Sequence, residues 1–139
     1  MSRSLLIDTS IFSKILRKDP HVTPTLHEEL MDGSTVLVSP LVYYELRRGL
    51  LRKDSQRLMQ ALNDLVTRYL WIDVTRSDWD TAASLWARIV RAGRPRGDAD
   101  ILIAAQANNR GAVVVTNNVK HFNNLADELE DWSATPPSP

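Results

Sequence analysis

Short apolar runs alternate with longer helical patterns along most of this chain, and this alternation limits the folds open to it. Four runs have the composition and length of buried strands, and they cover residues 4–8, 35–39, 70–74 and 112–116. Helical patterns fill the intervals, at residues 9–17, 22–31, 41–52, 56–69, 78–92 and 98–110. Strands that alternate with helices are typical of an α/β fold, because crossover helices pack on the faces of a parallel sheet. We therefore predict a three-layer α/β/α domain with a central, mostly parallel sheet of four to five strands.

Composition narrows the class of protein further. The 139 residues include no cysteine, which removes disulfides, thiolate metal ligands and cysteine nucleophiles. Seventeen basic residues balance seventeen acidic ones, so any affinity for nucleic acid must come from local clusters of charge. The chain has neither an apolar run of the roughly 20 residues that a membrane span needs nor the apolar core of a signal peptide. We expect a single soluble domain in the cytoplasm, without membrane contact.

Acidic residues stand at several of the predicted strand-to-helix junctions. Asp8 ends the first strand, Glu45 lies in the helix after the second strand, and Asp100 lies in the first turn of the helix at 98–110. The carboxyl ends of parallel strands meet at one edge of a sheet, where open α/β folds keep their sites. Taken singly, each acid has a structural explanation, such as a helix cap or an ion pair of Glu45 with Arg48 or Arg52. Their shared edge favours a common chemical role.

Four motifs resemble, in their order and spacing, those of a known nuclease family. They are LLIDTSIF at residues 5–12, SPLVYYELRRG at 39–49, GRPRGDADILIAAQA at 93–107 and VVVTNNVKHF at 113–122. The chain resembles PIN-domain ribonucleases, and among them the VapC toxins of bacterial type II toxin–antitoxin systems. The resemblance implies a PIN domain over residues 1–132, with a short last strand at LEDW (129–132). The proline-rich residues 133–139 are expected to be a disordered tail.

The same resemblance implies an activity, a cofactor and partners. It implies a toxin that is an endoribonuclease dependent on Mg²⁺ or Mn²⁺ and that cuts structured RNA, with transfer RNA prominent among the substrates of such toxins. The implied reaction is attack of metal-activated water on a phosphodiester. A cognate VapB-like antitoxin is expected to hold the enzyme inactive, and a homodimer is the expected assembly.

Position by position, the resemblance assigns the metal ligands to Asp8, Glu45 and Asp100. The fourth catalytic position of the PIN pattern falls on Asn118, where many family members carry Asp. An amide offers a neutral oxygen but cannot neutralise the charge of a cation. Three carboxylates set three negative charges against the two positive charges of one Mg²⁺, so we expect one tightly bound ion, with a second bound weakly or brought by the substrate.

Several polar residues near these acids have two explanations each. Ser10 and Thr116 are expected either to orient ligands or water, or to cap helices and form turns. Asp98 follows Gly97 at a helix start, and we interpret it as an ordinary N-cap. The histidines show no ligand spacing, and His121 is expected at most to touch the substrate.

Arginines supply the candidate contacts with RNA. Arg94 and Arg96, in the loop before the helix at 98–110, are the best placed to reach phosphates near the acids. Arg48 belongs to a second cluster on the predicted helical hairpin at 41–69. A solvated charged face is the competing explanation for both clusters.

Other functions remain open from the sequence. A PIN-like domain that binds RNA or a partner without cutting fits the absence of an acid at Asn118. A phospho-acceptor receiver domain needs an Asp after its middle strand with a late Thr and Lys, and Asp73, Thr116 and Lys120 form a thin version of that set. A haloacid-dehalogenase-type phosphotransferase needs a second Asp two residues after the first, where this chain has Ser10.

Overall fold

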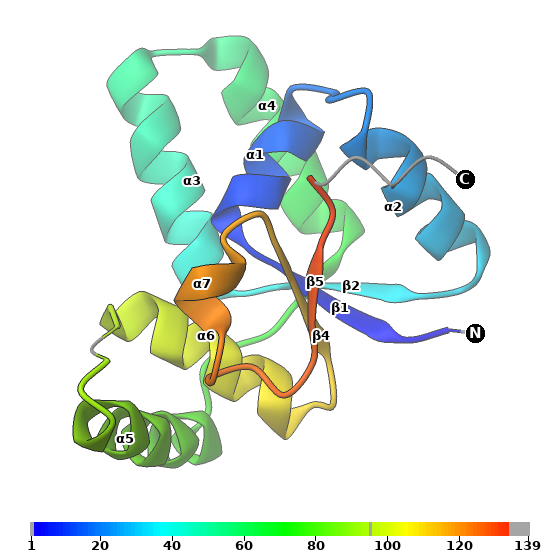
Figure 1. Cartoon of the computed structure of the whole chain (residues 1–139). Coiled ribbons are helices and arrows are strands. Elements are labelled where there is room, and N and C mark those ends of the chain that lie inside the picture. The colour runs from blue at the N-terminus through cyan, green and yellow to red at the C-terminus, as the bar shows by residue number, and fades with distance from the viewer. Residues whose placement is uncertain (1, 95, 134–139) are drawn as a thin grey trace.

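In the residues that the computed structural model describes, 2–94 and 96–133, a five-stranded sheet forms the centre of the molecule (Figure 1). The strands are β1 (Ser4–Ile7), β2 (Thr35–Val38), β3 (Leu70–Trp71), β4 (Val113–Thr116) and β5 (Leu129–Asp131). They lie in the order β3-β2-β1-β4-β5, and every neighbouring pair is parallel. In the central register, Leu6 of β1 pairs with Leu37 of β2 and Val114 of β4. The predicted parallel sheet of four to five strands is confirmed.

Helices connect these strands and cover both faces of the sheet. Their bounds are α1 (Thr9–Leu16), α2 (Val22–Met31), α3 (Pro40–Lys53), α4 (Gln56–Arg68), α5 (Arg76–Arg91), α6 (Asp98–Asn109) and α7 (Val119–Phe122). The chain steps from β1 to β2 to β3 in one direction and then crosses back to β4 on the other side of β1. Right-handed crossovers therefore put α1 to α4 on one face and α5 and α6 on the other. The predicted three-layer α/β/α architecture is confirmed.

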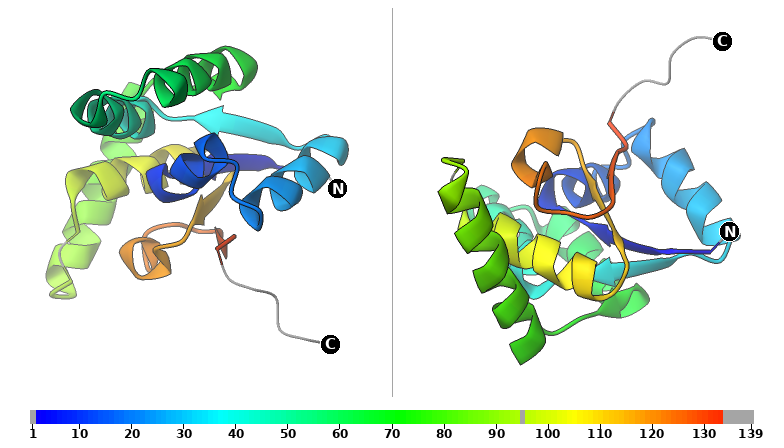
Figure 2. Two further views of the ribbon diagram at one scale, coloured as in Figure 1. Left: turned by 90° about the horizontal axis from the view of Figure 1, so that it is seen from above. Right: turned by 60° about the horizontal axis from the view of Figure 1, so that its bottom comes forward.

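Most contacts between the helices follow this division, although α3 and α6 also meet. α1 packs against α2, α3 and α4, whereas α6 packs against α5 and against the central strands β1 and β4. Figure 1 shows α1 to α4 in the upper half of the view and α5 below them, and the right-hand view of Figure 2 shows α5 and α6 side by side. The starts of α1, α3, α6 and α7 lie toward the end of the sheet opposite the N-terminus.

The hydrophobic core explains why the strand segments were recognisable. Residues 5–7 of β1 are fully buried, and residues 113–115 of β4 are at most 3 % exposed, because helices cover both faces of a parallel sheet. In α6, residues 101–107 are all buried, since this helix lies between the sheet and α5. The apolar sequence of α6 is thus the expected one for a buried helix.

The third strand ends at Trp71, three residues before the expected end, and two helices also differ from the sequence-based expectation. α5 begins at Arg76, two residues early, because Thr75 and Asp78 form a capping box. In it the Thr75 N–H donates to Asp78 Oδ2 at 2.8 Å and the Asp78 N–H donates to Thr75 Oγ1 at 3.2 Å. The helix α7 was not predicted, because four residues are too short to show a periodic pattern.

Arg3 forms ion pairs at the end of the sheet opposite Asp8. Its guanidinium contacts Glu29 of α2 and Glu130 of β5, with 2.9 Å between Nη2 and Glu130 Oε1. The hydrogen bonds that Arg3 donates to both carboxylates raise its pKa. Trp132 Nε1 also donates to Glu130 at 3.0 Å. These contacts hold the short edge strand β5 to β1 and α2.

Gly49 is a position where a substitution is expected to stabilise the fold. It lies inside α3, and a Cβ added there would meet nothing within 4 Å. We therefore predict that Gly49→Ala raises the free energy of unfolding by about 0.5–1 kcal/mol, because alanine loses less backbone freedom on folding. Gly33 is the matched contrast, since its φ of +86° strains any other residue. In urea unfolding, Gly49→Ala should have a higher free energy of unfolding than the natural chain, and Gly33→Ala a lower one.

The sequence predicts where the domain and its tail begin and end, and it predicts no membrane contact. The domain bounds 1–132 stay a prediction, and the tail expected at 133–139 lies, apart from Ser133, outside the described residues. Ser133 itself donates hydrogen bonds to Asp131 Oδ1 from its N–H at 2.8 Å and its hydroxyl at 2.6 Å. Among the described residues, no helix is both long and apolar enough to cross a membrane.

Candidate active site

Asp8 stands at the end of β1 with both carboxylate oxygens held in place. It is the N-cap of α1, and its Oδ1 accepts from the Ile11 N–H at 3.2 Å. The Ser10 hydroxyl donates to Oδ1 at 2.6 Å, and the Thr116 hydroxyl at the end of β4 donates to Oδ2 at 2.6 Å. Burial raises the pKa of the Asp8 carboxyl, and the hydrogen bonds that it accepts partly oppose this rise. Asp8 is thus a rigid, buried acid at the centre of the sheet edge.

Glu45 reaches this edge from α3. Ser39 after β2 caps the helix and Pro40 occupies its first turn, so the helix direction is set at the sheet edge. The Thr9 hydroxyl, next to Asp8, donates to Glu45 Oε1 at 2.9 Å. The expected partner Arg48 is also present, 3.9 Å from Oε2, but this pair is largely exposed. The bond to Thr9 links Glu45 directly to the start of α1.

Asp100 comes to the same edge from the first turn of α6. His121 of α7 lies close to it, with 3.7 Å between Nδ1 and Asp100 Oδ2. Burial raises the pKa of the Asp100 carboxyl, His121 lowers it, and the nearby negative charges of Glu45 and Asp8 raise it further. The three predicted acids therefore lie within electrostatic reach of one another. The negative charges of Glu45 and Asp8 thus favour a cation beside Asp100.

The acids do not form a closed metal cage. Within residues 2–94 and 96–133, no three Asp, Glu or His side chains lie close enough to hold a metal ion as they stand. Mg²⁺ does not need such a cage, because it usually binds through one or two carboxylates and keeps water or substrate phosphate as its other ligands. The carboxylates of Asp8, Glu45 and Asp100 are of the oxygen type that hard divalent cations prefer, and one or two of them suffice for such open binding.

Asn118 lies at this edge with its side chain exposed. Its backbone N–H donates to Thr116 Oγ1 at 2.8 Å, so it supports the hydroxyl that holds Asp8. Asn118 occupies the N-cap position of α7, but its side chain makes no capping hydrogen bond. The Asn117 N–H donates to Ser10 Oγ at 3.2 Å and supports the second hydroxyl in the same way.

The interpretation of Asp98 as an N-cap was wrong. The N-cap of α6 is Gly97, and no side chain caps this helix. Gly97 has the extended backbone that a cap position requires, with φ −67° and ψ 148°, so Asp98 is already the first helical residue. Asp98 is exposed and lines a pocket beside Trp79 and Trp86, away from Asp8.

The arginine candidates lie near different acids, Arg96 near Asp100 and Arg48 near Glu45. Arg96 lines a pocket of about 400 Å³ together with Gly97, Asp100, Lys120 and His121. Arg94 lines a neighbouring pocket that also includes Arg96. Arg48, next to Glu45, has its guanidinium 5.0 Å from the centre of the Tyr44 ring.

The receiver-like alternative is wrong. Asp73 follows β3, which is the edge strand of the sheet, whereas the middle strand is β1. Asp73 Oδ1 accepts a hydrogen bond from Trp71 Nε1 at 2.7 Å. The acid that follows the middle strand is Asp8.

Sequence reasoning missed a buried bridge between the two helices that carry Glu45 and Asp100. The Ser39 hydroxyl, which caps α3, donates to Gln106 Oε1 of α6 at 2.6 Å. Gln106 Nε2 donates to the Ile72 carbonyl after β3 at 3.1 Å, and both polar side chains are 0 % exposed. Their separation of 67 positions along the chain leaves no local signal in the sequence. The bridge holds together α3 and α6, the helices that carry Glu45 and Asp100.

We predict that Gln106→Leu lowers the free energy of unfolding by about 2 kcal/mol, because the Ser39 hydroxyl and the Ile72 carbonyl lose their buried partner. Denaturant unfolding measures the loss. Gln60→Leu is the matched control, since the Gln60 side chain donates its hydrogen bond to Asp64 in an exposed position, and its change should stay within about 0.5 kcal/mol. Equal stabilities of the two variants would contradict a role of the bridge in holding α6.

Comparison with known proteins decides the family. The model of the PIN domain family matches residues 5–128. The chain belongs to the PIN domain family. Within this family, ribonuclease VapC19 of Mycobacterium tuberculosis is 32 % identical over 117 residues, which cover 84 % of this chain and 90 % of the relative. The PIN-domain chain described here therefore belongs with the VapC ribonucleases.

Other PIN-domain relatives agree in sequence and in structure. The tRNA(fMet)-specific endonuclease VapC of Shigella flexneri is 29 % identical over 136 residues, covering 92 % of this chain and 97 % of that protein. The crystal structure of VapBC2 from Rickettsia felis, bound to a DNA fragment from its promoter, contains a chain with a TM-score of 0.78 and 27 % identity. That match covers 93 % of this chain and 98 % of the other. The resemblance seen in the four motifs is confirmed.

Proposed function

We propose that this protein is the toxin of a toxin–antitoxin pair and acts as a metal-dependent endoribonuclease. The observation that supports the proposal is that Asp8, Glu45 and Asp100 come from three separate elements and that the charges of Asp8 and Glu45 act on Asp100. Family membership with the VapC ribonucleases supports the same activity.

Asp8, Glu45 and Asp100 would hold a divalent cation, Mg²⁺ or Mn²⁺. When bound, such a cation acidifies water and offsets the charge that builds up on the phosphate during hydrolysis. The fixed position of Asp8 supports its role as the main ligand, because two hydroxyls and one backbone N–H orient its carboxylate. Glu45 and Asp100 are partly exposed, with side chains 30 % and 29 % accessible, so they can adjust when cation and substrate arrive together.

The surrounding residues have supporting roles in this proposal. Ser10 and Thr116 orient Asp8, and Thr9 orients Glu45. Asn118 offers a neutral amide oxygen for water or for the substrate and adds no negative charge, which favours one tightly bound cation over two.

We propose structured RNA as the substrate, with transfer RNA as the first candidate. Arg94 and Arg96 on one side and Arg48 on the other would contact phosphates on either side of the cut. The name of the Shigella flexneri relative, a tRNA(fMet)-specific endonuclease, supports the choice of transfer RNA.

We propose a VapB-like antitoxin as the partner that keeps the enzyme inactive, and a homodimer as the assembly. Support for the partner comes from solved complexes of relatives, VapBC2 of Rickettsia felis and VapBC of Salmonella typhimurium, which are 27 % and 26 % identical to this chain. RNA and antitoxin would both be met in the cytoplasm.

The test is cleavage of unfractionated transfer RNA by the purified chain free of antitoxin. We expect cleavage with Mg²⁺, none with a chelator, and none by Asp8→Asn. Asp80→Asn, an exposed acid of α5, is the control and should cut like the natural chain. If the natural chain binds RNA without cutting it, the alternative of a non-catalytic PIN domain holds. Asn118→Asp is then the first variant to test for cleavage.

A further inference from the structure

A second pocket lies next to the one that contains Asp100, and of its lining the proposed function uses only Arg94 and Arg96. It has a volume of about 630 Å³, within the roughly 300–1,000 Å³ of small-molecule sites. It lies between the end of α5, the following loop and the segment at 123–127 that leads to β5. Its lining includes three arginines, two asparagines and one aspartate around apolar side chains.

The wall of this pocket is built before any ligand arrives. Asn108 of α6 holds the segment at 123–127 from below, because its Nδ2 donates to the Leu125 carbonyl at 2.8 Å and its Oδ1 accepts from the Asp127 N–H at 2.8 Å. From the side, the Arg88 guanidinium donates to the Asn124 carbonyl. Asn124 adopts a left-handed backbone with φ 71°, which turns this carbonyl toward α5. A wall fixed from two helices is suited to selective binding.

The chemistry of the lining matches one nucleotide of RNA. Ile89 and Leu125 are buried apolar residues that offer a floor for a flat base, and Asn123 and Asp127 offer donors and acceptors for its edge. The guanidiniums of the arginines can pair with phosphate oxygens. A nucleotide site differs from a plain charged surface because it combines apolar side chains, hydrogen-bonding groups and cationic side chains.

The position of the pocket connects it to the acids. Arg96 lines this pocket and also the smaller one that contains Asp100, Lys120 and His121. An RNA strand that crosses the loop at Arg96 would place one nucleotide in the larger pocket and a neighbouring phosphate beside Asp100.

We propose that this pocket, named here the α5 pocket and lined by Arg88, Ile89, Ala92, Arg94, Arg96 and residues 123–127, binds a nucleotide adjacent to the cleaved bond. The assignment rests on the proposed ribonuclease function and adds to it a residue set that selects the substrate. The α5 pocket would read an unpaired base, because only a base outside a helix can enter a recess with its face and edge exposed.

Two variants on α5 separate a shaped pocket from general attraction. Ala92→Trp fills the α5 pocket without changing charge, and we expect it to weaken RNA affinity about tenfold, as for the loss of one stacked base. Arg91→Ala removes a charge three residues from Arg88, but Arg91 is exposed and its Nε donates to the Ala87 carbonyl. Arg91→Ala should therefore leave affinity within about twofold, whereas Arg88→Ala should weaken it.

The affinity is measured with labelled unfractionated transfer RNA and with the Asp8→Asn chain as the inactive background. In the active chain, Ala92→Trp should raise KM and change kcat little. Asn123→Ala is a second variant for the case that Ala92→Trp unfolds, and thermal unfolding of each variant identifies that case.

Three results would overturn the assignment, and they are distinguishable. If the natural chain neither binds nor cuts RNA, the proposed function fails and the α5 pocket assignment falls with it. If the natural chain cuts RNA but Ala92→Trp and Asn123→Ala bind like their parent, only the pocket assignment is wrong. If Ala92→Trp weakens inhibition by the antitoxin and leaves RNA affinity unchanged, the α5 pocket binds protein.

Discussion

Asp100→Asn should lower the rate of RNA cleavage by about 1,000-fold. The change removes one carboxylate from the set that would hold the cation, and loss of several kcal/mol of transition-state stabilisation corresponds to a factor of this size. The shape of the side chain is nearly kept, and the burial that raises the pKa of Asp100 means that a neutral amide costs the fold little. Cleavage of unfractionated transfer RNA under single-turnover conditions measures the rate.

Asp98→Asn is the matched control for this prediction. Asp98 lies in the same first turn of α6, carries the same charge and is exposed, but it lines a pocket beside Trp79 and Trp86 rather than the one that contains Asp100. Its rate should stay within about twofold of the natural chain, since surface charges contribute little. Equal losses in Asp98→Asn and Asp100→Asn would mean that the helix start matters as a charged patch and that Asp100 has no special role.

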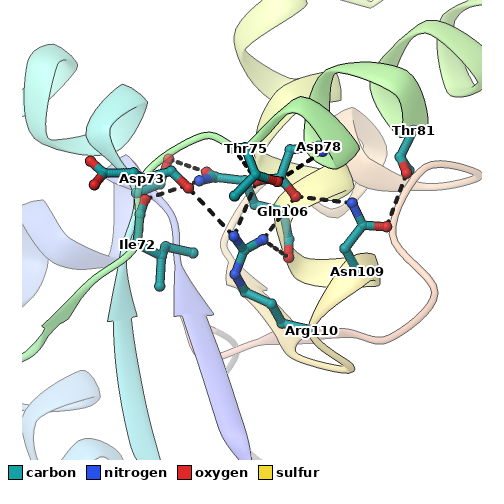
Figure 3. A network of polar contacts seen from close by, with 9 residues as sticks. Ile72, Asp73, Thr75, Asp78, Thr81, Gln106, Asn109 and Arg110 are labelled. Atoms are coloured by element: carbon teal, nitrogen blue, oxygen red, sulfur yellow. Dashed lines mark hydrogen bonds and ion pairs between the residues drawn. The ribbon is translucent and has the colours of Figure 1, made fainter.

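Arg110→Ala should lower the free energy of unfolding by about 3 kcal/mol, the second large effect. Figure 3 shows the network concerned, in which Arg110 at the end of α6 meets Asp78 near the start of α5. Arg110 Nη1 lies 2.9 Å from Asp78 Oδ1, and Asn109 Nδ2 donates to the same oxygen at 2.9 Å. The Asp78 side chain is 1 % exposed, so removal of Arg110 leaves a buried charge without its cation.

A double variant tests this explanation. Asp78→Asn removes the buried charge, so Arg110→Ala should cost much less in the Asp78→Asn background than in the natural chain. Arg91→Ala, which removes an exposed arginine of α5, should change stability by less than about 0.5 kcal/mol. Additive losses in the double variant would show that Arg110 acts through packing and that the charge of Asp78 is irrelevant.

The same network predicts how stability depends on pH. Burial raises the pKa of Asp78, but hydrogen bonds from Arg110, Thr75 and Asn109 outweigh it and hold the pKa well below the ordinary value of 3.8. A lowered pKa means that the folded chain binds the proton less readily than the unfolded chain does. The stabilisation from Asp78 is therefore complete above pH of about 5 and is lost as the pH falls through and below the ordinary value. The stability difference between the natural chain and Asp78→Asn should be constant from pH 5 to 7 and should shrink below pH 4.

Local patterns were sufficient to predict four of the five strands, whereas the short strand β5 needed the resemblance. β1 and β4 are short, apolar and bounded by polar residues, and their burial on both faces makes such a pattern unavoidable. Asp8 could be predicted as a candidate site residue because it ends a buried apolar strand, at the edge where open α/β folds keep their sites. Glu45 and Asp100 needed the resemblance to the PIN family, since each has an ordinary structural explanation when taken alone.

What the sequence did not reveal depends on contacts between distant segments. Asp78 and Arg110 stand 32 positions apart, and only the packing of α5 on α6 brings them together. The same is true of Ser39 and Gln106, which join helices from opposite faces at the edge of the sheet. His121 reaches Asp100 because the short helix α7 turns the chain back toward α6, and a helix of four residues leaves no periodic pattern.

The most direct test of the central claim is Mn²⁺ binding measured by calorimetry, in the absence of RNA and antitoxin. The claim that Asp8, Glu45 and Asp100 share one cation predicts one Mn²⁺ per natural chain, an affinity at least about tenfold weaker for Asp8→Asn and Asp100→Asn, and an unchanged affinity for Asp98→Asn. Binding of equal strength in the natural chain and in Asp8→Asn would contradict the claim.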